Sequence, residues 1–213
     1  MRVGLLAAAL TISAQTICWA QTEHVLRPIK FDAPTLAPMA YTQFCVRYPN
    51  ECRARQPIFR GGRIKLTNLR WTELVNVNSS VNSSICPEAN PVADHEWLLS
   101  PDVGNCNDYS VTKRHELIAS GWPARALLLS EVATFSGQHH VVVVVRTSIG
   151  DLVLDNLTEV IMPWFQKPFQ WVRIQTLRNP NFWVSVSEPD AARAMVSRPV
   201  PQRRTASIRS GVT

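Results

Sequence analysis

The chain has 213 residues, with 22 lysines and arginines against 16 aspartates and glutamates, so its formal net charge is +6. Five of the arginines lie in the stretch 189–213, where Asp190 is the one acidic residue, and the rest of the chain is nearly neutral. This distribution argues against a nucleic-acid-binding domain. We expect 189–213, rich in proline, serine and arginine, to be a basic disordered tail or, alternatively, an electrostatic tether to an anionic surface.

Residues 1–20 have the pattern of an export signal, with one arginine, an apolar run and the cleavage motif "CWA" ending at Ala20. The apolar run is much shorter than the roughly 20 residues that span a membrane, and no later run reaches that length. We therefore predict a periplasmic or secreted protein with a cleaved signal peptide and no transmembrane segment. The remainder has the size of one domain, and we expect a monomer.

Residues 21–36 are dense in proline, and we predict an irregular lead-in to a single domain at 37–188. A short helix is predicted from Pro38 to Tyr48, because proline suits its first turn and Pro49 lies beyond its end. A brief strand is predicted next, in "GGRIKLT".

Four cysteines remain once the signal is removed, and export to an oxidising compartment favours pairing of some of them. Cys45 and Cys52 are seven residues apart with Pro49 forcing a turn between them, which brings their Cα atoms within bonding range. We predict this disulfide. Cys86 and Cys106 either form a second bridge or remain free thiols.

A longer helix is predicted over 68–85, with Thr67 as its N-cap and apolar residues at three- and four-residue spacing on one face. Its other face carries asparagine and serine, including glycosylation-type triplets at Asn78 and Asn82; a third such triplet starts at Asn156. A polar loop, 86–95, follows.

The next predicted helix runs from Cys106 to Ser120, because this segment lacks internal proline and glycine and Gly121 suits a helix end. Beyond it, short β-branched, leucine-rich or aromatic runs separated by turn residues are typical of an antiparallel sheet. These runs are 124–132, 139–147, 151–156, 169–177 and 182–187. Helices followed by strands predict an α+β fold.

Cys106 is predicted in the first turn of its helix, where unpaired backbone N–H groups and the helix dipole favour a thiolate. Gly104 just before it permits close backbone approach, which would let the Cys106 amide face a substrate oxyanion. The local context alone does not separate a nucleophile from a buried structural cysteine.

A cysteine nucleophile needs a base, and the chain has five histidines. His139 and His140 open the most apolar strand and point to opposite faces, so one of them can face the thiol. The other three lie in the lead-in, in a loop, or too far along the helix axis, at His24, His95 and His115.

The strand that follows offers two acids that could orient the base, Asp151 and Asp155. A hairpin turn centred on 147–148 pairs His140 directly with Asp155, a turn centred on 148–149 makes them diagonal neighbours, and a turn centred on 149–150 separates them. The sequence leaves this register open. Asp155 alternatively just begins a turn.

Together these segments resemble the bacterial transglutaminase-like cysteine peptidases. The resemblance rests on "VGNCNDYSVTKRHELIASGWPARALLL", "HHVVVVVRT", "GDLVLDNL" and "FCVRYPNEC", and covers most of residues 36–186. It implies a papain-like or transglutaminase-like core, with Cys106 as the nucleophile, His140 as the base, Asp155 as the orienting acid and an acyl-enzyme intermediate. Trp97 and Asn105 are further candidates for contact with the substrate or the oxyanion, although Trp97 alternatively fills the core.

The resemblance also raises the question of calcium. The family includes calcium-dependent periplasmic proteases that release biofilm adhesins and bind the metal through acidic residues around the cysteine. Here those positions hold Asn105, Asn107 and Asp108. An amide oxygen coordinates calcium without contributing charge, so we expect a weakened calcium site and no required cofactor. Asp108 alternatively stabilises the helix dipole.

The sequence thus predicts an exported thiol hydrolase that cleaves peptide or amide bonds in a protein or peptide substrate, such as a cell-surface or periplasmic protein. Two alternatives stay open. One is a transglutaminase that passes the acyl group to an amine, and the other is a non-catalytic binding or scaffolding domain in which Cys106 is bonded to Cys86. No nucleic acid partner is expected.

Overall fold

The computed structural model describes residues 27–54, 63–88 and 96–187. Several predictions fall outside the described residues: the signal peptide at 1–20, the first part of the lead-in, most of the polar loop 86–95, and the basic tail. His24 and His95 also lie outside them. Among the described residues, no helix combines the length and apolar character that crossing a bilayer requires.

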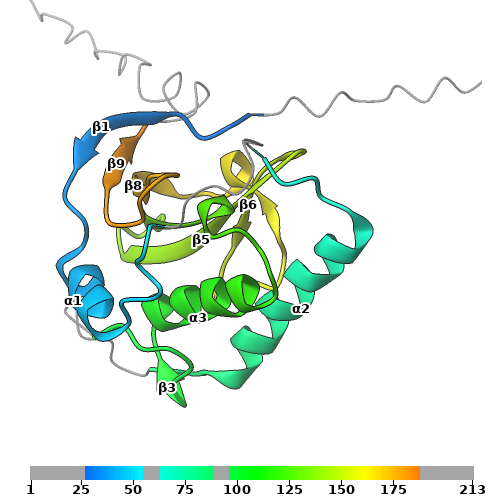
Figure 1. Ribbon diagram of the computed structural model, residues 1–213, viewed down its shortest axis with the longest axis horizontal. Coiled ribbons are helices and arrows are strands. Elements are labelled where there is room, and N and C mark those ends of the chain that lie inside the picture. Colours follow the sequence, from blue (N-terminus) through cyan, green and yellow to red (C-terminus); the bar gives the residue numbers. More distant parts are fainter. Residues whose placement is uncertain (1–26, 55–62, 89–95, 188–213) are drawn as a thin grey trace, which may run out of the picture.

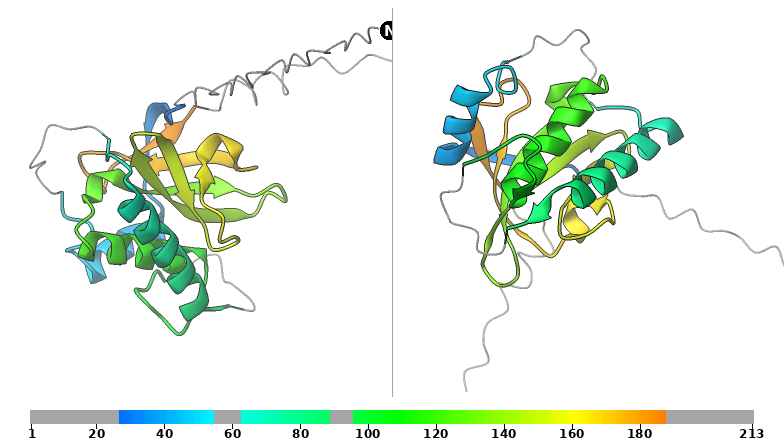
Figure 2. Two further views of the ribbon diagram at one scale, coloured as in Figure 1. Left: turned by 90° about the vertical axis from the view of Figure 1, so that its right-hand side faces the viewer. Right: turned by 90° about the horizontal axis from the view of Figure 1, so that it is seen from below.

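The described residues form an antiparallel sheet of seven strands with α1, α2 and α3 on one side of it (Figures 1 and 2). The strand order is β1-β9-β8-β4-β5-β6-β7, and β2 and β3 form a separate parallel pair. This arrangement confirms the predicted α+β class. The strands are β1 (Phe31–Thr35), β2 (Cys86–Pro87), β3 (Val103–Gly104), β4 (Leu127–Ala133), β5 (His139–Thr147), β6 (Gly150–Leu154), β7 (Met162–Pro163), β8 (Gln170–Gln175) and β9 (Trp183–Val186).

The three helices lie where the sequence predicts them, at α1 (Met39–Arg47), α2 (Asn68–Ser84) and α3 (Cys106–Ala119). Thr67 caps α2 through a hydrogen bond that its hydroxyl accepts from the Arg70 N–H. α3 packs on β5 and against α2, and its apolar side chains enter the main core together with alternate valines of β5. Two single-turn 3-10 helices, η1 (Ala124–Ala126) and η2 (Trp164–Gln166), lead into β4 and β8.

Two local predictions are wrong. The supposedly irregular lead-in contains β1, which pairs with β9 at the edge of the sheet. An edge strand tolerates proline, and the register shifts between Phe31 and Pro34, so the proline does not break the pairing. "GGRIKLT" forms no regular strand over its described part, because Ile64 makes only an isolated bridge to Thr147.

The β5–β6 hairpin has one of the three registers that the sequence leaves open. Thr147 pairs with Gly150 and Val143 with Leu154, so the turn is centred on residues 148–149. Gly150 has a φ of 124°, a backbone conformation that favours glycine. In this register Asp155, just after β6, is a diagonal neighbour of His140 on the same face of the hairpin.

Cys45 and Cys52 form the predicted disulfide, with their Cα atoms 5.5 Å apart. The bond joins α1 to the segment after it, and the Asn181 side chain donates a hydrogen bond to the Cys52 carbonyl across the fold. Cys86 and Cys106 are both free thiols, so the alternative second bridge is not formed.

The disulfide generates a stability prediction. A variant with Cys45→Ser and Cys52→Ser lacks the bond that closes this short loop. Its free energy of unfolding should be about 2 kcal/mol lower than that of the wild type. Denaturant unfolding under non-reducing conditions measures this difference, and dithiothreitol should lower the stability of the wild type but not of the variant. Cys86→Ser serves as the control and should leave stability unchanged. Equal stability of the double variant and the wild type would contradict the prediction.

Candidate active site

Cys106 is the first residue of α3, and a reciprocal cap holds the backbone around it. The side-chain Oδ1 of Asn105 accepts a hydrogen bond from the Asn107 N–H at 3.0 Å. Asp108 returns the contact, because its Oδ2 accepts from the Asn105 N–H at 2.9 Å. The backbone of Cys106 is thereby held at the positive end of the helix, with its thiol half-buried.

Asp108 is completely buried and also fixes the segment that precedes the helix. Its Oδ1 accepts a hydrogen bond from the Leu98 N–H at 2.7 Å. A Cβ atom at Gly104 would lie 2.6 Å from Asp108 Oδ2, so this position requires glycine. The close approach that Gly104 permits is therefore an approach to the Asp108 carboxylate.

An open cleft of about 800 Å³ lies over the start of α3 and the start of β5. Cys106, His140, Asn105 and Asn107 line it, and Trp97 forms part of its wall. Trp97 is only 2% exposed and packs edge-on against Tyr41, with ring centres 5.5 Å apart. It therefore belongs to the core and borders the cleft at once.

His140 is buried at the start of β5, and its Nε2 lies 2.8 Å from Asp155 Oδ1. This bond uses one ring nitrogen and leaves Nδ1 on the other side of the ring. Ser110 of α3 donates a hydrogen bond to the Val141 carbonyl at 2.9 Å, which ties the Cys106 helix to the strand beside His140. His139, in contrast, has a side chain that is 77% exposed, and its Nδ1 lies 2.7 Å from Glu131 Oε1.

The pKa values of His140 and Asp155 reflect their contact. Burial lowers the pKa of His140, but the hydrogen bond to Asp155, the interaction with Cys106 and the negative charges of both outweigh burial and raise it to about 9. Burial favours neutral Asp155, but the hydrogen bond and charge of His140, then the hydrogen bonds from Lys167 and the Leu157 N–H, hold its pKa well below the usual range. The geometry thus favours an imidazolium bound to a carboxylate at neutral pH.

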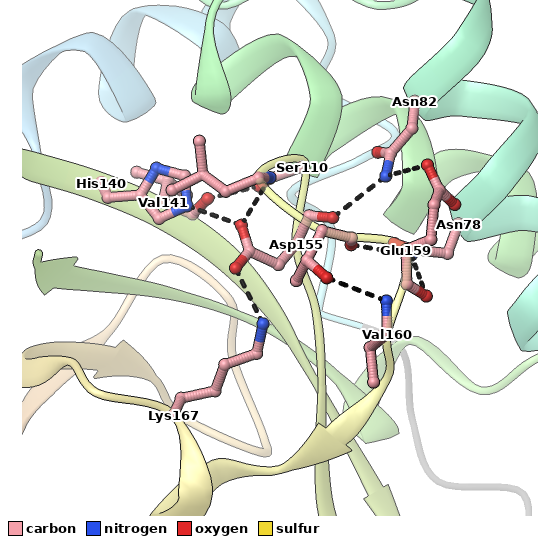
Figure 3. Close-up of polar contacts among 11 residues, drawn as sticks. Asn78, Asn82, Ser110, His140, Val141, Asp155, Glu159, Val160 and Lys167 are labelled. Carbon is pink, nitrogen blue, oxygen red and sulfur yellow. Dashed lines mark hydrogen bonds and ion pairs between the residues drawn. The ribbon is translucent and has the colours of Figure 1, made fainter.

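Asp155 is surrounded by donors from several parts of the fold, as Figure 3 shows. Its Oδ1 also accepts a hydrogen bond from the Leu157 N–H at 3.1 Å, and its Oδ2 accepts one from Lys167 Nζ at 2.9 Å. Asn82 of α2 donates to the Asp155 carbonyl at 3.2 Å and to Glu159 Oε1 at 2.9 Å. The backbone and the carboxylate of Asp155 are therefore both fixed.

Asn78 extends this support along α2. Its side-chain amide is buried and donates a hydrogen bond to the Glu159 carbonyl at 3.3 Å. The asparagine-rich face of α2 therefore holds the loop after β6, and the buried amide of Asn78 has no room for a glycan. The spacing of Asn78 and Asn82, one helical turn apart, is the sequence signal for this role.

The remaining candidates lie away from the cleft. Asp151 has a structural role, because its Oδ2 accepts a hydrogen bond from the Ile29 N–H at 2.8 Å and its Oδ1 lies 3.2 Å from Arg63. His115 lies on α3 with its Nδ1 2.7 Å from Glu51 Oε1. Neither residue lines the cleft.

Two buried lysines close to Asp155 were not predicted from the sequence. Lys167 is bonded to Asp155, and Lys113, on α3, has an Nζ with no hydrogen-bond partner. Burial lowers the pKa of Lys113 to about 7, although the charges of Asp155 and Glu159 partly oppose this shift. A lone lysine in the aromatic run "WFQKPFQW" is the one sequence signal for Lys167.

The predicted calcium ligands do not fit a calcium site. Asp108 supplies the one carboxylate of the set, and both of its oxygens accept backbone hydrogen bonds. The Asn105 oxygen is likewise used by the Asn107 N–H. Calcium takes six to eight oxygen ligands, and a set with one charge, in which Asp108 and Asn105 face backbone amides and Asn107 faces the Cys106 thiol, does not supply them. Across the described ranges, no three histidine, cysteine or acidic side chains gather as a metal-binding group.

One protein family matches most of the chain. A model described as "Bacterial transglutaminase-like cysteine proteinase BTLCP" matches residues 31–191. No curated protein matches the chain. Solved structures of LapG from Legionella pneumophila are similar. One is 24% identical and covers 54% of this chain and 68% of its own, with a TM-score of 0.46. The calcium-bound form is 21% identical, with coverages of 62% and 83% and a TM-score of 0.49. The EGTA-treated form is 21% identical, with coverages of 60% and 75% and a TM-score of 0.47.

The unpaired Lys113 generates a pH-dependent prediction. The pKa of Lys113 is near 10.5 in the unfolded chain and about 7 in the folded protein. Burial of the charged ammonium therefore destabilises the fold by its full amount below pH 7. The destabilisation decreases as the pH rises from 7 to 10.5. Lys113→Met should therefore raise the thermal midpoint, and more at pH 6 than at pH 9. Scanning calorimetry at the two pH values measures this, with the exposed Lys65→Met as control. A loss of stability, or an equal gain at both pH values, would contradict the prediction.

Proposed function

Because the chain belongs to the bacterial transglutaminase-like cysteine proteinase family, we propose that it is an exported peptidase that cleaves a protein substrate with Cys106, His140 and Asp155. The observation that supports this most strongly is the buried contact of 2.8 Å between His140 and Asp155, at the cleft that Cys106 also lines. The pattern of residues 1–20 supports export to the periplasm or beyond.

The nucleophile in this proposal is the Cys106 thiolate. His140 has a pKa of about 9, so it is an imidazolium at neutral pH and its charge stabilises the thiolate beside it. The sulfur attacks the substrate carbonyl carbon, a C–S bond forms, and the carbonyl electron pair moves onto oxygen. As the first residue of α3, Cys106 has an N–H without an acceptor inside the helix, and this N–H donates to the oxyanion.

His140 then acts as the acid. It transfers its Nδ1 proton to the leaving amine, the C–N bond breaks, and a thioester to Cys106 remains. The neutral imidazole next takes a proton from water, whose oxygen attacks the thioester, and the carboxylic acid product leaves as the thiolate re-forms. Asp155 stabilises the imidazolium and holds the ring in one orientation throughout, as an orienting acid does in other triads.

The open cleft has room for several residues of a polypeptide, as a protein substrate requires. An amine that enters in place of water would take the acyl group, so acyl transfer is the competing outcome of the same intermediate. The free thiol of Cys106 speaks against the alternative of a scaffold with a bond from Cys106 to Cys86.

We predict that Cys106 is alkylated by iodoacetamide at least tenfold faster than Cys86 near pH 7, because His140 stabilises its thiolate. Mass spectrometry of the two cysteine-containing peptides gives both rates in one sample, and exposed Cys86 serves as the internal reference. His140→Ala should remove the difference, whereas the matched variant His139→Ala, at the exposed neighbouring histidine, should keep it.

Cleavage tests the same prediction with substrates. A library of peptides from bacterial surface proteins should gain new N-termini on incubation with the wild type and not with Cys106→Ala. Incorporation of an added amine without new N-termini would replace hydrolysis by acyl transfer. Equal rates for Cys106 and Cys86, together with no reaction of the library, would contradict the catalytic assignment.

We further propose that the enzyme works without calcium, since its donor set does not fit the ion. Calcium chloride and EGTA should leave the thermal midpoint and the Cys106 alkylation rate of the wild type unchanged. A double variant with Asn105→Asp and Asn107→Glu adds two carboxylates and should gain a calcium-dependent rise in the midpoint. A wild-type midpoint that rises with calcium and falls with EGTA would contradict this proposal.

A further inference from the structure

Lys167 contacts the carboxylate oxygen of Asp155 that His140 does not use. Its Nζ lies 2.9 Å from Oδ2, and His140 Nε2 lies 2.8 Å from Oδ1, so the carboxylate bridges a lysine and a histidine (Figure 3). The side chains of Lys167 and Asp155 are 3% and 2% exposed. Water and salt therefore screen this ion pair very little, and the loss of either partner leaves a buried charge.

Lys167 lies in the segment between η2 and β8, away from the β5–β6 hairpin in the sequence. Lys167 follows η2, and its N–H donates a hydrogen bond to the Trp164 carbonyl at 3.2 Å. The ring of Phe169, two residues on, lies 5.6 Å from Lys167 Nζ and also 5.6 Å from the ring of His140. One short segment thus packs against both members of the histidine–aspartate pair.

Both oxygens of the Asp155 carboxylate accept hydrogen bonds, and these bonds restrict its rotation. Oδ1 accepts hydrogen bonds from His140 and the Leu157 N–H, and Oδ2 accepts one from Lys167. Rotation about the Cβ–Cγ bond would break contacts at both oxygens. With the carboxylate fixed, the His140 ring is fixed as well, with Nε2 toward Asp155 and Nδ1 toward the cleft.

The charged groups near Asp155 come from three different parts of the fold. They are His140 on β5, Lys167 after η2 and Lys113 on α3; Glu159, in the loop that follows β6, interacts with Lys113. Lys113 has no hydrogen-bond partner, so Lys167 is the lysine that makes a directed contact with the carboxylate.

We propose that Lys167 is a positioning residue, which holds the Asp155 carboxylate in the one orientation that aligns His140 with Cys106. This proposal rests on the proposed function of the three residues. It assigns Lys167 no contact with the substrate, and its effect passes through Asp155 and His140 to the thiol.

The test compares Lys167→Met and Lys167→Gln with the wild type in the full chain, by the ratio of iodoacetamide alkylation rates at Cys106 and Cys86 from pH 4 to pH 10. Lys167→Met should lower the ratio about tenfold at pH 7, since a hydrogen bond to a charged group is lost. It should also move the acidic edge of the profile, where the thiolate–imidazolium pair of Cys106 and His140 is lost, to higher pH, because the ammonium bonded to Asp155 no longer favours the ionised state of the site. Lys167→Gln retains an N–H donor without charge and should restore most of the ratio at pH 7 but not the edge.

Lys113→Met is the matched control, since it also removes a buried lysine near Asp155, but one without a hydrogen bond. Its ratio and acidic edge should match those of the wild type. A merely structural role of Lys167 would lower the thermal midpoint without moving the edge, and that result would overturn the proposal, as would a wild-type profile for Lys167→Met. If Lys167→Met does not fold, the acidic edge of Lys167→Gln is compared with that of the wild type: a shift to higher pH supports the proposal, and an unchanged edge overturns it.

Failure of this proposal is distinguishable from failure of the proposed function. If His140→Ala lowers the ratio and the Lys167 variants do not, the positioning role alone is wrong. If His140→Ala also leaves the ratio unchanged, the assignment of the three residues is wrong as well.

Discussion

Asp155 is a carboxylate that remains charged inside the protein, and such a charge persists only where partners compensate for its lost hydration. The three groups that donate hydrogen bonds to its carboxylate come from β5, from the segment after η2 and from its own loop. Asn82 of α2 holds its backbone as well. Because these partners lie far apart in the sequence, the whole fold has to form before the carboxylate is satisfied, and the orientation of His140 at the cleft follows from that satisfaction.

Much of the architecture follows from local sequence signals. Proline and glycine positions place the ends of α1 and α3, Thr67 predicts the start of α2, and β-branched runs predict the central strands. The positions of Cys106 and of the two adjacent histidines follow from the same signals. The sequence does not predict β1, because its proline argues against pairing, and only the position of β1 as the edge strand beside β9 explains why the proline is tolerated.

The parts that could not be predicted depend on contacts between distant segments. Three hairpin registers fit the sequence equally, and the turn at residues 148–149 decides that His140 and Asp155 are diagonal neighbours. Lys167 lies twelve residues after Asp155, and its aromatic surroundings in the sequence do not indicate which carboxylate its side chain reaches. At Gly104 the group in close approach is the Asp108 side chain, a contact that the sequence does not indicate.

The central claim is that buried Asp155 keeps His140 protonated beside Cys106. The most direct test is an NMR titration of the His140 ring nitrogens in isotopically labelled protein. The structure predicts an imidazolium that persists through neutral pH and loses its proton at a pKa of about 9, with the Nε2 proton shared with Asp155. A His140 ring that titrates near its usual value of 6.5 would contradict the account.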